Sequence, residues 1–116
     1  MGGLRRLEGR IARATGADSG LDRAIREALD GAAPADGVPP YTASVDACLA
    51  LIGRALPGWH WHVGWGPGGI LPYASLSRDG AGPAGRVEMT APTVPLALLG
   101  TLVKAARLDR GGADAE

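Results

Sequence analysis

The stretch LPGWHWHVGWGPGGILPYASLSR, residues 56–78, decides how this chain folds. Pro57 and Gly58 end a helix, and the residues that follow alternate strictly in side-chain character, as in a β-strand. Residues 66–69 have the composition of a turn, and residues 70–78 resemble a second strand. This order predicts a β-hairpin. Pro72 in the second strand favours an edge position or a bulge.

The alternation divides the first predicted strand into two faces. One face carries Trp59, Trp61, Val63 and Trp65, and the other carries His60, His62 and Gly64. Three aromatic side chains at a period of two are typical of the packed side of a strand, so Trp59 and Trp61 are predicted to lie in the core. Trp65 stands beside the turn, and we expect it to be partly exposed.

The sequence around the hairpin predicts four helices and a third strand. Apolar residues recur at helical spacing in residues 4–14, 21–29 and 45–56, and RVEMTA at 86–91 alternates like a strand. Asp18 or Ser19, Thr42 or Ser44, and Thr93 are candidate helix caps. The segment from Leu96 to Val103 is apolar almost all round, which predicts the best-buried helix.

These elements predict an α+β fold with a small, mostly antiparallel three-stranded sheet behind an N-terminal helical hairpin. We divide the chain into the hairpin at 1–30, a linker at 31–40, an α+β domain at 41–108 and a disordered tail at 109–116.

Composition narrows the functional classes. The net charge of the 116 residues is zero, so we expect no direct binding to nucleic acid or anionic membranes, while self-association into a homo-oligomer is favoured. Cys48 is the only cysteine, which excludes an intramolecular disulfide and a cysteine-rich zinc site and fits a reducing cytoplasm. The sequence lacks the apolar core of a signal peptide, and its longest apolar run is too short for a membrane span.

Three motifs carry a family resemblance. They are Tyr41-Thr42-Ala43-Ser44 with Asp46 opening a helix, Pro57-Gly58-Trp59-x-Trp61-x-Val63 entering a strand, and an apolar helix capped by Thr93 and Pro95. With these motifs, residues 41–108 resemble the phage ABA sandwich domain, a family of small phage-associated proteins. The likeness implies helices on both faces of the sheet, an α/β/α sandwich, and an origin in a phage or prophage. It implies no catalytic residue.

The chain also departs from that family. Many relatives have Pro-Glu-Gly-Trp where this sequence has Leu56-Pro57-Gly58-Trp59, and the last helix begins Thr93-Val94-Pro95 rather than Thr-Pro. The middle of the chain, with its glycine-rich turns, has no counterpart in the family pattern. Residues 7–29 resemble a leader that often precedes such domains.

His60 and His62 form the first candidate site. Two imidazoles on one face of a strand have a spacing that metal sites use, but a third ligand is needed. Asp46, Cys48 and Glu88 are the available kinds of side chain, and the sequence places none of them nearby. The alternative is that both histidines simply line the second face of the strand. We therefore predict no metal and no cofactor.

Cys48 beside either histidine could be read as a nucleophile and its base. However, Cys48 falls on the apolar face of its helix, where a small buried hydrophobe is the usual role. The glycines at 64–69 lead into a strand rather than a helix, so they predict a hairpin turn and not a dinucleotide loop. No catalytic residues are assigned, and the chain is not expected to be an enzyme.

A binding role remains. Six residues are predicted to form a ligand or partner surface: Trp65, Tyr73, Arg78, Arg86, His60 and His62. The favoured hypothesis is a non-enzymatic counter-defence protein in the bacterial cytoplasm. It would inhibit a host immune protein, or sequester a small nucleotide-like signal held between protomers near Trp65, Tyr73 and Arg78. The alternatives are a phage structural or assembly protein, and a small metal-dependent enzyme using His60 and His62.

Overall fold

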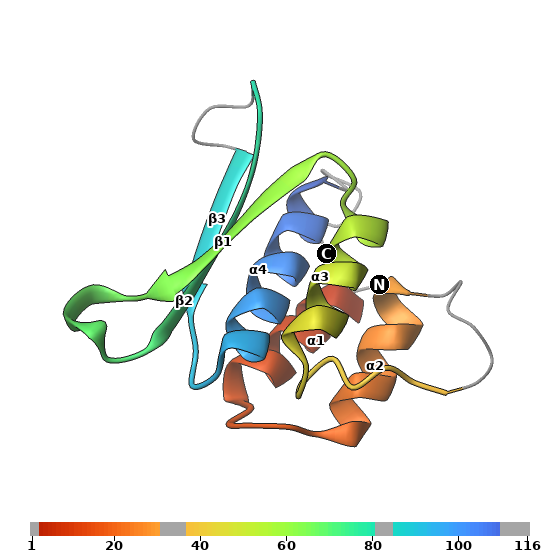
Figure 1. The fold of residues 1–116 in the computed structure, drawn as a ribbon. Helices are drawn as coiled ribbons and strands as arrows, with labels where there is room; N and C mark the ends of the chain where they lie inside the picture. Colours follow the sequence, from red (N-terminus) through yellow and green to blue (C-terminus); the bar gives the residue numbers. More distant parts are fainter. Residues whose placement is uncertain (1–2, 31–36, 81–84, 110–116) are drawn as a thin grey trace.

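A computed structural model describes residues 3–30, 37–80 and 85–109 of the chain. These residues form an α+β fold with a three-stranded antiparallel sheet and an N-terminal pair of helices, as predicted (Figure 1). The helices are α1 (Gly3–Arg13), α2 (Ser19–Leu29), α3 (Val45–Ala55) and α4 (Val94–Asp109), and the strands are β1 (Trp59–Trp65), β2 (Pro72–Arg78) and β3 (Arg86–Thr90). Most of the predicted linker and tail lies outside the described residues.

The predicted caps start three of the helices. The Asp18 side chain accepts a hydrogen bond from the Leu21 N–H at 3.0 Å, and Ser44 accepts one from Ala47 at 3.1 Å. Thr93 accepts one from the Leu96 N–H at 3.3 Å. Each bond satisfies an N–H group that has no partner within its own helix.

The sheet has the order β1-β2-β3. Trp59 lies opposite Arg78 and Trp65 lies opposite Pro72, so β1 and β2 pair along their whole length. Pro72 therefore belongs to the central strand, and the prediction of an edge or a bulge there was wrong. Proline is tolerated because it is the first residue of its strand. The turn between β1 and β2 contains the short 3-10 helix η1 (Pro67–Gly69), in which Gly68 and Gly69 have positive φ.

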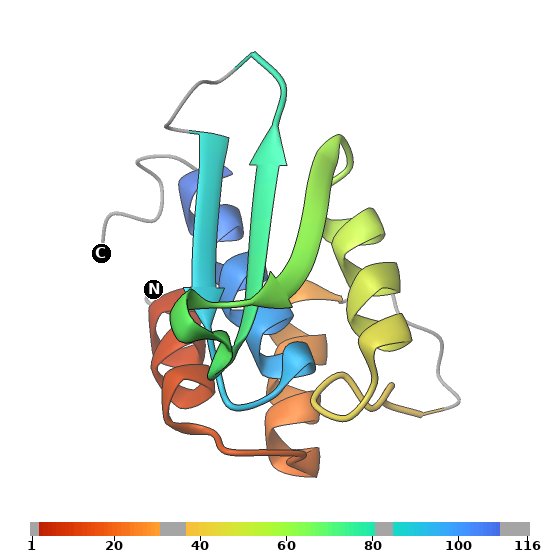
Figure 2. The same cartoon turned by 60° about the vertical axis from the view of Figure 1, so that its left-hand side comes forward.

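Helix α4 lies between the sheet and the other helices (Figure 2). Ten of its residues are buried, which confirms it as the best-buried helix. All four helices lie on the same face of the sheet, so the second helical layer implied by the family likeness is not present in the described residues. The opposite face bears His60, His62, Tyr73, Arg86, Glu88 and Thr90. These polar side chains give a second helical layer nothing apolar to cover.

Trp61 is less buried than predicted, whereas Trp65 beside the turn is exposed, as expected. Only Trp59 is packed against the core, whereas Trp61 is 44% exposed and Trp65 is 67% exposed. Their side chains do point toward the helical side, because they share the face of Leu76 and Ala74 in β2. However, α4 packs beneath β2 and β3, and β1 is the edge strand that extends beyond it. The prediction of Trp61 as a core residue was therefore wrong.

A buried polar network fastens the N-terminal pair to the rest of the chain. Asp22 on α2 accepts hydrogen bonds from the Thr42 N–H at 2.8 Å and from the Thr42 hydroxyl at 2.7 Å. The carboxylate of Asp30 accepts one from the Tyr41 hydroxyl and two from the Arg54 guanidinium. The motif at residues 41–44 is thus a packing and hydrogen-bonding element between α2 and α3.

Candidate functional site

The structure divides the six predicted binding residues between the two faces of the sheet. His60, His62, Tyr73 and Arg86 point to the open face, and Trp65 and Arg78 point to the helical side. Trp65 and Arg78 also lie at opposite ends of the β1–β2 ladder. The predicted ligand group of Trp65, Tyr73 and Arg78 is therefore not assembled within one copy of the chain.

The Arg78 side chain makes contacts within the fold. Its guanidinium carbon lies 5.2 Å from the centre of the Trp59 ring, and one of its nitrogens lies 2.9 Å from a carboxylate oxygen of Asp109. A cation over an indole face is an attractive arrangement. Arg78 thus fastens the first residue of β1 to the C-terminal end of α4.

Tyr73, Arg86 and Glu88 form a cluster on the open face. The Tyr73 hydroxyl donates to Glu88 Oε1 at 2.7 Å and accepts from an Arg86 guanidinium nitrogen at 2.9 Å. The hydrogen bonds from Tyr73 and Arg86 hold the pKa of the Glu88 carboxyl below its usual range, and the bond to Glu88 raises the pKa of Arg86. Because Arg86 is paired with a carboxylate, the cluster has little charge to offer to an anion.

Within the described residues, the fold does not complete a set of three metal ligands around the histidines. His60 Nε2 lies 3.4 Å from Asp79, and Glu88 is already bonded to Tyr73 and Arg86. In the described ranges, no three His, Cys, Asp or Glu side chains are grouped to share an ion.

Cys48 is buried in the core, where desolvation raises the pKa of its thiol to about 12. Cys48 is the buried small side chain that its helix position predicted.

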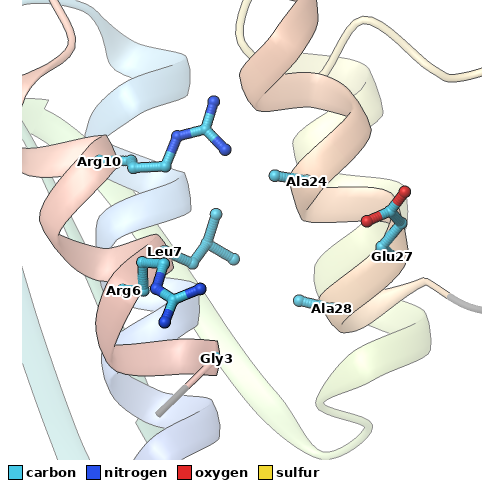
Figure 3. Close-up of a pocket in the computed structure, with 7 residues that line it drawn as sticks. All are labelled: Gly3, Arg6, Leu7, Arg10, Ala24, Glu27 and Ala28. Atoms are coloured by element: carbon cyan, nitrogen blue, oxygen red, sulfur yellow. The ribbon is translucent and has the colours of Figure 1, made fainter.

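A groove between α1 and α2 is a second feature of the surface (Figure 3). Its volume is about 310 Å³, and its lining residues are Gly3, Arg6, Leu7, Arg10, Ala24, Glu27 and Ala28. Arg6 and Arg10 extend from α1, and the short side chains of Ala24 and Ala28 line the groove on the side of α2. The nearby carboxylate of Glu27 offsets part of their charge, so the groove lacks the strong positive field of an anion site.

Of the seven exposed large apolar side chains among the described residues, five gather on β1 and on the turn that follows it, while Val38 and Leu108 lie elsewhere. The five are Trp61, Val63, Trp65, Ile70 and Leu71, which we call the β1 apolar surface. Ile70 is 76% exposed. This end of the hairpin reaches beyond the helical layer (Figure 1). Sequence reasoning found Trp65 but missed the others, although Ile70 and Leu71 beside a glycine-rich turn were a usable signal for exposure.

The backbone of β1 adds hydrogen-bonding groups to this surface. The Gly66 N–H donates to the Leu71 carbonyl at 2.8 Å, so Gly66 faces β2. In an antiparallel ladder, the backbone N–H and C=O groups of successive residues point alternately to the two sides of the strand. The backbone groups of Gly64 and His62 therefore also point to β2, while those of Trp65, Val63 and Trp61 point away from it. The N–H and C=O groups of these three residues point to the free edge of the sheet. They are available for pairing with another strand.

Comparison with known protein families, curated proteins and solved structures finds no match to this chain. The resemblance to the phage family therefore remains a prediction. Within the described residues, no helix is both long and apolar enough to cross a membrane.

Proposed function

We propose that this protein is a non-enzymatic binding protein that docks another polypeptide on the β1 apolar surface and its free edge. The observation that carries the proposal is the coincidence of two features on one strand. The apolar side chains of Trp61, Val63 and Trp65 are exposed, and no strand of the described residues lies beside the backbone groups of the same residues. An extended segment added to an edge strand uses both features.

The size of the surface fits this role. Taking about 250 Å² for a whole tryptophan, Trp61 and Trp65 together expose roughly 280 Å². Covering that area at about 25 cal/mol per Å² contributes roughly 7 kcal/mol. Association costs about 4–15 kcal/mol in lost translational and rotational freedom, so the two amounts are comparable. Val63, Ile70 and Leu71 and the edge hydrogen bonds then supply net affinity.

A polypeptide fits the geometry better than a nucleotide-like ligand. Trp65 and Arg78 lie at opposite ends of the hairpin, and Arg86 is engaged by Glu88. The β1 apolar surface extends along a strand, and it carries no charged side chain that would hold a phosphate. A small anionic ligand needs a converging set of donors in a concave site.

The biological setting of this proposal rests on the family likeness. A phage-derived binding protein of this size, without assigned catalytic residues, fits an accessory protein that inhibits a host immune component in the bacterial cytoplasm. Rescue of phage growth on a defended host would support this setting, and failure to rescue on any defended host would remove it. Presence of the protein in purified virions would favour the alternative of an assembly protein.

Site-specific photo-cross-linking tests the docking surface directly. A photoreactive phenylalanine analogue replaces Trp65 in the full chain, expressed in the cells that carry it. The matched control places the analogue at Thr90, which is exposed at the same end of the sheet but on its open face. We expect a discrete polypeptide adduct from position 65 that Trp61→Ser abolishes. Equal adducts from both positions, or none from position 65, would refute the proposal.

A further inference from the structure

We infer that the polypeptide docked on the β1 apolar surface is a second copy of this chain, paired antiparallel through β1 about a two-fold axis at His62. This inference rests on the proposed function, because it names the partner of the same surface. Its first support is the difference between the two edges of the sheet. β3 is short, and the charged residues Arg86 and Glu88 occupy alternate positions in it. By contrast, β1 has no Lys, Arg, Asp, Glu or Pro. Charges and prolines are what protect an edge from pairing.

The backbone pattern of β1 is self-complementary. A two-fold axis at His62 sets Trp61 opposite the partner's Val63 and Trp59 opposite the partner's Trp65, so each of the seven residues has one opposite it. The Trp59 N–H already donates to the Leu56 carbonyl at 3.2 Å, so at the two ends of the ladder Trp59 contributes its carbonyl alone. The N–H and C=O groups of Trp61 and Val63 face the free edge, and in this register they face each other in both copies. Shifting the axis by one residue along the strand leaves residues at its ends unpaired.

The same axis places apolar side chains together. A two-fold axis perpendicular to the sheet keeps the faces of both copies aligned, so the two tryptophan faces become continuous on the helical side. Each hairpin tip, which extends beyond its own helices, then lies beside the partner's Trp59, where β1 leaves α3 (Figure 2). The tip thus gains cover that its own copy does not provide.

The exposed apolar area supplies a large part of the area that a dimer interface needs. Trp61 and Trp65 expose roughly 280 Å², and Val63, Ile70 and Leu71 extend this to the range of about 300–600 Å² for the largest patches on single-chain proteins. The backbone and the histidine face of a seven-residue strand add polar area toward the roughly 800 Å² per partner of a standard interface. The net charge of zero produces little repulsion between copies.

Sedimentation of the full chain over a concentration series is the first test. We expect a dimer that dissociates on dilution. Val63→Pro removes an N–H that faces the free edge without removing a β1–β2 bond, so this variant should stay folded by circular dichroism and dimerise at least tenfold more weakly. A dimer unaffected by Val63→Pro would overturn the inference. A wild-type chain that is monomeric at every concentration would overturn it too.

Charged variants at position 62 test the register. His62→Asp and His62→Lys each place like charges across the axis, and each should weaken the homodimer about two- to fivefold, while a mixture of the two should form the heterodimer preferentially. His60→Asp and His60→Lys are the matched controls, because position 60 faces the partner's Gly64 and mixing should bring no preference. Preference at position 60, or none at position 62, would overturn the register.

The two proposals fail in different ways. A monomeric protein whose position 65 cross-links to a different polypeptide would end the inference of a dimer and leave the docking surface in place. A dimer that persists with Val63→Pro, together with no adduct at position 65, would end both.

Discussion

Gly100 makes a close contact between α4 and the sheet, and it offers a quantitative test of the packing. A Cβ atom at this position would lie 1.9 Å from the sulfur of Met89 and 2.9 Å from its terminal methyl carbon. Alanine in place of glycine within a helix gains about 1 kcal/mol from propensity. Overpacking a filled site costs about 1–3 kcal/mol. Because the Met89 side chain must move, the two contributions together predict that Gly100→Ala lowers the free energy of unfolding by about 0–2 kcal/mol.

A double-mutant cycle with Met89→Ala separates these contributions. With the methionine shortened, the overpacking cost disappears and Gly100→Ala should become neutral or stabilising, which gives a coupling energy of about 1–3 kcal/mol. Gly53 in α3 is the matched control, since a Cβ there meets nothing within 4 Å, and Gly53→Ala should stabilise by about 0.5–1 kcal/mol. Urea unfolding followed by circular dichroism measures all five proteins. A cost at position 100 that is unchanged by Met89→Ala would refute the contact.

Three further predictions concern buried groups. Thr42→Val removes the hydroxyl that donates to Asp22 and should cost about 2–3 kcal/mol in urea unfolding, whereas Thr42→Ser keeps the donor and should cost less than about 1 kcal/mol; equal costs would contradict the bond. The Arg54 hydrogen bond lowers the pKa of Asp30, so its stabilisation is present above the ordinary carboxyl pKa of about 3.9 and is lost as pH falls through the lower folded value. The stability of Asp30→Asn should therefore fall less below about pH 4 than that of the wild type, and parallel curves would argue against this pair. Burial raises the pKa of Cys48 to about 12, so a thiol reagent should label it only as fast as the chain opens, and rapid labelling of the native protein would show otherwise.

Local signals in the sequence account for the elements of this fold. Asp18, Ser44 and Thr93 were all identified as candidate caps because each is a short polar residue before an apolar periodic segment. Such signals act within a few residues, and they do not depend on how the elements pack. For two of the helices these signals allowed two alternative caps. The structure shows that Asp18 and Ser44 are the caps.

The position of each element in the sheet could not be read from the same signals. Strict alternation assigned Trp61 to the apolar face of β1, and that assignment holds in the register with Leu76. Whether such a face is covered depends on where α4 packs, and that is decided by long-range contacts. The Asp22–Thr42 bond joins residues 20 positions apart, and no local pattern indicates it.

The two edges of the sheet together limit how far self-association can proceed. An unprotected edge on both sides would allow chains to add without end, as in a growing fibre. In the proposed dimer, pairing through β1 would leave two copies of β3 as the outer strands of a six-stranded sheet. Each outer edge carries Arg86 and Glu88, which are held in a cluster with Tyr73, and charged side chains oppose further pairing. The asymmetry between β1 and β3 therefore favours a closed dimer over an open polymer, and species larger than a dimer in sedimentation would contradict it.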